Sequence, residues 1–194
     1  MNKKIFARII AIIAIVGMIV VGNSALAYSG DGFSIDVPST YTSVGNNMWQ
    51  KSSEANINIQ VTSNEDGEAA TKDTLDKLVK QLEKQYSSWS IEGSEVTKVA
   101  NGNYKCLHIT SKVMGMYVDQ YAIPTKDKIY TITIGASDNN YFSSDEAKDM
   151  IKSFKIDNYK EPKSGKATVV IVVIVVVAVV AGAVIVIKKK KSQN

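Results

Sequence analysis

Residues 92–134 read EGSEVTKVANGNYKCLHITSKVMGMYVDQYAIPTKDKIYTITI, and this stretch decides the fold. It divides into four strand-like segments: Glu92–Val99, Tyr104–Val113, Met116–Ile123 and Ile129–Ile134. Short polar or glycine-containing turns separate these segments, and turns of that length join neighbouring antiparallel strands. We therefore expect four consecutive strands of one antiparallel sheet.

Alternating apolar residues upstream predict three more strands. They are expected at Phe33–Val37, which Pro38 ends, at Met48–Gln50 and at Ile57–Val61. In each of the two longer segments every second residue is apolar, which is typical of a strand with one buried face.

Two segments instead show the period of a helix. One apolar stripe consists of Leu75, Leu78, Val79, Leu82 and Tyr86. Another, close to the end of the domain, consists of Ala147, Met150, Ile151 and Phe154. Asp73 is the expected N-cap of the first helix, and Ser143 with Glu146 has the spacing of a capping box before the second.

The predicted order is three strands, a helix, four strands and a helix. This order predicts an α+β domain, residues 28–160, in which a mostly antiparallel sheet of about six to seven strands packs with two helices. About 130 residues suffice for one domain with its own hydrophobic core.

Residues 1–27 have the pattern of a secretory signal peptide. A basic start is followed by the apolar run Ile9–Val21 and by Ala25 and Ala27, which form the A-x-A pattern of a signal-peptidase site. Cleavage after Ala27 would leave Tyr28 at the mature N-terminus. The alternative is an uncleaved N-terminal anchor, and either version exports the residues that follow.

The segment Ala167–Ile187 predicts a transmembrane helix. It contains no charged residue, and at ~1.5 Å per residue it crosses a hydrocarbon core of about 30 Å. The stop-transfer residues Lys188, Lys189, Lys190 and Lys191 begin a basic tail, 188–194, which the positive-inside rule assigns to the cytoplasm. These lysines could also contact anionic lipids. The expected location is therefore the cell membrane, with a single span and the domain outside.

The linker, residues 161–166, permits a second kind of anchoring. Pro162, Ser164 and Gly165 before an apolar run and a lysine tail resemble a degenerate cell-wall sorting signal, Leu-Pro-x-Thr-Gly. Glu161 stands where that pattern has leucine. Covalent attachment to the cell wall is thus the alternative to a permanent membrane anchor.

The charge of the domain differs from that of the whole chain. The chain has a net charge of +4, but residues 28–160 hold 14 lysines and 18 acidic residues, a balance of −4. The basic excess lies in the signal segment and around the predicted span. Nucleic acid is therefore not an expected partner.

Few residues suggest chemistry. His108 is the only histidine and Cys106 the only cysteine, so an internal disulfide and a cluster of histidine metal ligands are both excluded. Cys106 and His108 lie two residues apart on one strand face, where packing is the expected role rather than a nucleophile–base pair. Asn64–Glu68 lacks the ligand spacing of a calcium loop and is expected to be a solvated turn. No cofactor or metal site is predicted.

Aromatic residues are the better candidates for binding. Tyr117 and Tyr121 share one strand face and could line a ligand groove, although packing beneath a helix is the expected role. The same two interpretations apply to Trp49 and Trp89.

Three segments resemble the PsbP-like fold, named for an extrinsic photosystem protein. They are Gly32–Tyr41 (GFSIDVPSTY), Lys128–Thr133 (KIYTIT) and Met150–Lys155 (MIKSFK). The resemblance covers most of residues 30–157. It implies a binding or assembly-assisting domain that is not an enzyme. No ligand or catalytic residue of the family maps onto this chain.

The expected function is that of a surface-tethered extracytoplasmic binding or assembly module, with the membrane and another envelope or membrane protein as partners. An envelope hydrolase is the rival class. A cleft with convergent ionisable groups would favour the hydrolase, and a flat or apolar groove would favour binding. The sequence assigns no oligomeric state.

Overall fold

Every strand pairing in the described part of the chain is antiparallel. The computed structural model describes residues 26–52, 54–85 and 89–162. The elements in chain order are β1 (Leu26–Gly30), β2 (Phe33–Val37), β3 (Thr42–Gly45), β4 (Met48–Lys51), β5 (Ala55–Ser63), α2 (Lys72–Gln85), β6 (Trp89–Val99), β7 (Tyr104–Val113), β8 (Met116–Pro124), β9 (Lys128–Ala136), the 3-10 helix η1 (Asn139–Ser143), α3 (Asp145–Ser153) and β10 (Lys155–Ile156).

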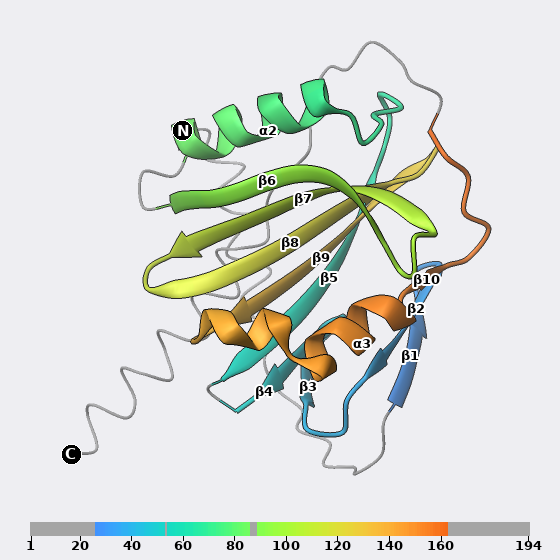
Figure 1. Cartoon of the computed structure of the whole chain (residues 1–194). Coiled ribbons are helices and arrows are strands. Elements are labelled where there is room, and N and C mark those ends of the chain that lie inside the picture. The colour runs from blue at the N-terminus through green and yellow to red at the C-terminus, as the bar shows by residue number, and fades with distance from the viewer. Residues whose placement is uncertain (1–25, 53, 86–88, 163–194) are drawn as a thin grey trace, which may run out of the picture.

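The strands form two sheets (Figure 1). The larger has seven strands in the order β3-β4-β5-β9-β8-β7-β6, and the smaller has three in the order β1-β2-β10. The α+β class, the antiparallel seven-stranded sheet and the two helices confirm the prediction. Expecting a single sheet was wrong, because Phe33–Val37 pairs with β1 and β10 rather than with the larger sheet.

The seven-stranded sheet has other elements packed on both of its faces. Because side chains alternate along β7, Cys106 and Leu107 belong to different clusters. On the face of Leu107 lie the apolar residues of α2, among them Leu78 and Leu82. On the face of Cys106 lie the small sheet and α3, which contribute Phe33 and Phe154. The larger sheet is thus the middle layer of the domain.

Both predicted N-caps lie one or two residues from the observed ones. The hydroxyl of Thr71 accepts the Thr74 N–H at 3.2 Å, while Asp73 lies in the first turn of α2 and pairs with Lys77 at 2.7 Å. The cap of α3 is Ser144, which accepts the Ala147 N–H at 3.2 Å. Thr71 and Ser144 provide the hydroxyls that reach the free N–H groups of the first turn.

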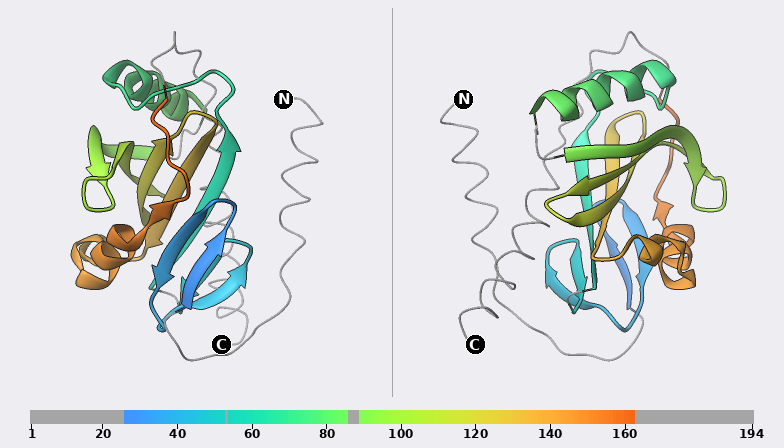
Figure 2. Two further views of the ribbon diagram at one scale, coloured as in Figure 1. Left: turned by 90° about the vertical axis from the view of Figure 1, so that its right-hand side faces the viewer. Right: turned by 60° about the vertical axis from the view of Figure 1, so that its left-hand side comes forward.

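Three short strands were not expected from the sequence: β1, β3 and β10. Each has five or fewer residues, and two of them are held by pairing with β2, a contact that no local pattern reveals. The start of β1 (blue) and the end of the segment that follows β10 (orange) lie toward opposite ends of the domain (Figure 2).

Several predictions fall outside the described residues. These are Ala25, Ser164, Gly165, the segment Ala167–Ile187 and the lysines 188–191. Ala27 lies in β1 opposite Asp36. None of the helices in the described ranges has the length and apolar character needed to cross a membrane.

Candidate functional site

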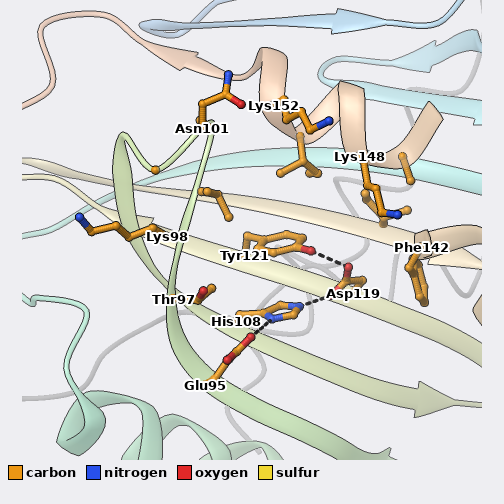
Figure 3. Close-up of a pocket in the computed structure, with 16 residues that line it drawn as sticks. Glu95, Thr97, Lys98, Asn101, His108, Asp119, Tyr121, Phe142, Lys148 and Lys152 are labelled. Carbon is orange, nitrogen blue, oxygen red and sulfur yellow. Dashed lines mark hydrogen bonds and ion pairs between the residues drawn. The ribbon is translucent and has the colours of Figure 1, made fainter. Parts of the chain in front are cut away.

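A groove lies between the seven-stranded sheet and α3, on the sheet face that carries Cys106 (Figure 3). We call it the α3 groove; its volume is about 380 Å³. Its walls come from β6, the β6–β7 turn, η1 and α3. The lining residues are Glu95, Thr97, Lys98, Val99, Ala100, Asn101, Gly102, His108, Asp119, Tyr121, Ile134, Phe142, Ala147, Lys148, Ile151 and Lys152.

Strand register assembles the floor of this groove. Glu95 on β6 lies opposite His108 on β7, and His108 lies opposite Tyr121 on β8. Directly opposed residues in an antiparallel sheet point to the same face, so the three side chains form one row across the sheet. Asp119 joins the row because it precedes Tyr121 by two positions on β8.

His108 is held between two carboxylates. Its Nε2 lies 2.5 Å from Asp119 Oδ1, and its Nδ1 lies 3.2 Å from Glu95 Oε1. The Tyr121 hydroxyl donates to Asp119 Oδ2 at 2.8 Å. The imidazole and phenol rings stack, with 4.4 Å between centroids and 2° between planes. The floor is therefore a pair of stacked rings, hydrogen-bonded to two carboxylates and held in place by rigid strands.

The two carboxylates favour the protonated form of the imidazole. Burial lowers the pKa of His108, but the hydrogen bond and charge of Asp119, and then those of Glu95, raise this pKa by more, so that it lies above 6.5. In the protonated ring both nitrogens donate. Burial and the charge of Asp119 also raise the pKa of Tyr121, so its hydroxyl remains a donor.

The two carboxylates differ in burial. The Asp119 side chain is 7% exposed, whereas that of Glu95 is 62% exposed. Asp119 is thus a fixed partner of His108 and Tyr121. Glu95 borders the solvent at the open side of the groove.

A second polar cluster anchors the start of α3. Glu146 Oε1 accepts from Lys51 Nζ and from the Tyr141 hydroxyl, both at 3.1 Å, and Glu146 Oε2 accepts from the Thr40 hydroxyl at 3.0 Å. The hydroxyls of Tyr41 and Tyr141 are also in contact. Burial raises the pKa of Glu146, but the bonds from Lys51, Thr40 and Tyr141 outweigh it and lower the pKa. The capping box predicted for Glu146 is thus wrong, since its carboxylate binds these partners.

The structure separates the residues that the sequence grouped together. Tyr121 lines the α3 groove, the less expected of its two interpretations, whereas Tyr117 lies next to Lys112, whose Nζ donates to its hydroxyl at 3.4 Å. Trp49 is buried in the core, and Trp89 packs against a small cluster at the β7–β8 end.

Cys106 does not take part in the histidine network. It is fully buried, and burial followed by the charge of Glu95 raises its pKa to about 12, so it remains a thiol. His108 takes its partners from neighbouring strands. The expected packing role of Cys106 agrees with this arrangement.

The loop Asn64–Glu68 is less solvated than expected. Its two end residues are buried, and the Asn64 amide donates to the carbonyls of Glu68 and Thr125 at 2.9 and 2.6 Å. The hydrogen bonds of the Asn64 side chain therefore hold the loop together. Within the described ranges no group of three or more His, Cys, Asp or Glu is arranged to hold a metal ion.

Two important residues of the site, Glu95 and Asp119, were missed by sequence reasoning. The signal was the length of two turns. The β6–β7 turn pairs Val99 with Tyr104 and so sets Glu95 opposite His108, and the two-residue β7–β8 turn sets His108 opposite Tyr121. Asp119, two residues before Tyr121, then points to the same face.

Comparison with known proteins provides fold similarity only. No family model and no curated protein matches the chain. A crystal structure from Bacteroides thetaiotaomicron VPI-5482 matches 68% of this chain at 14% identity and a TM-score of 0.41, and the chain spans 47% of that protein's length.

The solution structure of cyanobacterial PsbP from Synechocystis sp. PCC 6803 is also similar. The match covers 72% of this chain and 98% of that one, at 11% identity and a TM-score of 0.47. We assign no residue role from either structure.

Proposed function

We propose that this protein is a surface-tethered, extracytoplasmic binding module, and that the α3 groove is its ligand site. The observation that carries the proposal is the groove itself, with the stacked and hydrogen-bonded rings of His108 and Tyr121 at its floor. Ligand sites in proteins are concave and combine apolar walls with a few fixed polar groups. Val99, Phe142 and Ile151 supply apolar wall here.

The size of the groove limits what it holds. A volume of about 380 Å³ is near the lower end of the range for small-molecule sites, roughly 300–1,000 Å³. The ligand is therefore a small molecule, or one or two residues of a larger envelope component. Export and membrane tethering remain part of the proposal and rest on the signal-like and transmembrane-like segments of the sequence.

A hydrolase is the second candidate, because Asp119, His108 and Glu95 are ionisable groups that converge on one cleft. An Asp–His pair can orient a general base. Binding is favoured because both imidazole nitrogens already contact carboxylates, which leaves neither nitrogen free to accept a proton.

Turnover of p-nitrophenyl acetate separates the two functions. We expect native protein and a His108→Gln variant to show the same background rate, whereas a loss of turnover in the variant would support a hydrolase.

Filling the groove tests the proposed site. Thr97 on β6 is half-buried and lines the groove, so Thr97→Trp places a large ring in it. Ser94 on the same strand is exposed, lies outside the groove and opposes Ile109, so Ser94→Trp is the matched control. The ligand probe is benzamide, a neutral flat ring, observed by saturation-transfer NMR on the full chain in detergent micelles.

We expect benzamide to bind the native chain and the Ser94→Trp variant, and not to bind the Thr97→Trp variant. Protein-free micelles provide the blank, and amide spectra confirm that both variants are folded. Equal binding to all three proteins would place the ligand elsewhere and contradict the proposal.

A further inference from the structure

Lysines line the α3 side of the groove. Lys148 and Lys152 lie one helical turn apart on α3, and both are exposed. Lys148 has no ion pair within the described ranges, and Lys152 pairs with the exposed Asp149 of its own helix at 3.1 Å. The domain around them carries a net negative charge, so two cations at this wall provide a local site for an anion.

On the opposite side of the groove Glu95 faces solvent, and Lys98 of the same strand lines the rim with its ammonium group turned away from the stacked rings. Figure 3 shows Glu95 on one side of the stacked Tyr121 and His108 rings and the two α3 lysines on the other. Glu95 Oε1 contacts His108, whereas Oε2 has no hydrogen bond to any described residue. The charge of His108 is balanced by the buried Asp119, which leaves Glu95 as the negative group facing solvent.

We propose that the α3 groove binds a small zwitterionic ligand. Its anionic group lies at Lys148 and Lys152, its ammonium group lies at Glu95, and its middle part crosses the edges of the stacked Tyr121 and His108 rings. The complementary charges at the two walls fix the direction in which the ligand lies. This inference rests on the proposed function, because it needs the groove to be the ligand site.

Four ring compounds of similar size test it. They are 4-(aminomethyl)benzoate, with opposite charges at its two ends, benzoate, benzylamine and neutral benzamide. Affinities for the full chain in micelles are measured by NMR titration. We expect 4-(aminomethyl)benzoate to bind tightest, by roughly three- to tenfold over benzamide, since each partly exposed ion pair contributes only a few-fold.

Variants assign the two ends of the ligand. The double variant Lys148→Gln, Lys152→Gln is expected to lower the affinity for 4-(aminomethyl)benzoate and for benzoate roughly three- to tenfold, and to leave the affinity for benzylamine unchanged. Glu95→Gln is expected to lower the affinity for 4-(aminomethyl)benzoate and for benzylamine and to leave the affinity for benzoate unchanged. Lys80 is an exposed residue of α2, so Lys80→Gln is the control and should change none of these affinities.

The outcomes separate this inference from the function on which it rests. If all four compounds bind equally and Thr97→Trp abolishes binding, the groove is the ligand site and the charge inference is wrong. If benzylamine alone binds tightest, the α3 lysines do not select an anion and the inference is overturned. If Thr97→Trp leaves every affinity unchanged, both the proposed site and this inference fail.

Discussion

His108 shows how one residue depends on its neighbours on adjacent strands. Alone, an imidazole titrates near pH 6.5, but here it lies between Asp119 and Glu95 and against the ring of Tyr121. Burial opposes the charge and the two carboxylates favour it. The net effect is to raise the pKa of His108 in the folded protein.

The titration of His108 can be measured directly, because it is the only histidine in the chain. We expect its NMR midpoint to lie above 6.5, and to fall further in Asp119→Asn than in Glu95→Gln because Asp119 is the larger of the two raising influences. A native midpoint at or below 6.5 would contradict this description. Because the folded pKa is raised, the stabilisation relative to His108→Gln is complete below pH 6.5 and is lost as pH rises through the folded pKa.

Met114 is a residue whose backbone conformation does not suit its side chain. It has φ of 50° and Gly115 has φ of 87° in the two-residue turn between β7 and β8. Such turns favour Asn-Gly. We expect Met114→Asn to raise the free energy of unfolding by about 0.5–1 kcal/mol, measured by urea denaturation. Met116→Asn, inside β8, is the control and should not stabilise; an equal gain in both variants would contradict the turn explanation.

At the scale of elements, turn length determined how much of the site could be predicted. The four strands of residues 92–134 and their order follow from local alternation and short turns, and the same turns fix the register that opposes Glu95, His108 and Tyr121. The position of α3 does not follow, because it depends on contacts with distant segments. One of these is the Ser153 hydroxyl, which accepts the Asp36 N–H at 2.9 Å. The groove consists of a floor formed by β6, β7 and β8 and a wall formed by α3. Local sequence patterns indicate the floor but not the position of the wall.

Glu146 is expected to hold the start of α3, the wall of the groove. Glu146→Gln keeps the shape of the side chain and removes its charge, so the bonds from Lys51, Thr40 and Tyr141 weaken. We expect a loss of about 1–2 kcal/mol in the free energy of unfolding, measured by urea denaturation. Glu83→Gln on the exposed face of α2 should change stability by less than about 0.5 kcal/mol.

The pH dependence of this contribution has a definite sign. The folded pKa of Glu146 is lowered, so its stabilisation is present above pH 4.5 and is lost as pH falls through the folded pKa. An unchanged stability of Glu146→Gln at neutral pH would show that α3 is held by its apolar face alone.

At the scale of the whole molecule, the two faces of the seven-stranded sheet differ in how completely they are covered. On one face α2 closes a purely apolar cluster that includes Leu78, Leu82 and Leu107. On the other face the small sheet and α3 cover only part of the surface, and the uncovered part is the α3 groove. The proposed binding site is thus the part of the middle layer that the third layer leaves open.

Anchoring is tested by fractionating cells with and without lysozyme. We expect the chain to remain with the membrane after digestion of the cell wall, because Ala167–Ile187 predicts a permanent span. Release together with wall fragments, at a mass that lacks the valine-rich tail, would instead support processing at Pro162–Gly165.

The location of the ligand site is the central claim, and amide chemical-shift mapping tests it most directly. Full chain labelled with ¹⁵N is titrated with 4-(aminomethyl)benzoate in micelles. We predict that the shifted amides cluster in the part of β6 around Glu95–Asn101, at His108, at Asp119–Tyr121 and along Ala147–Lys152. Shifts that cluster on α2 or at the β7–β8 turn, with the groove residues unchanged, would contradict the claim.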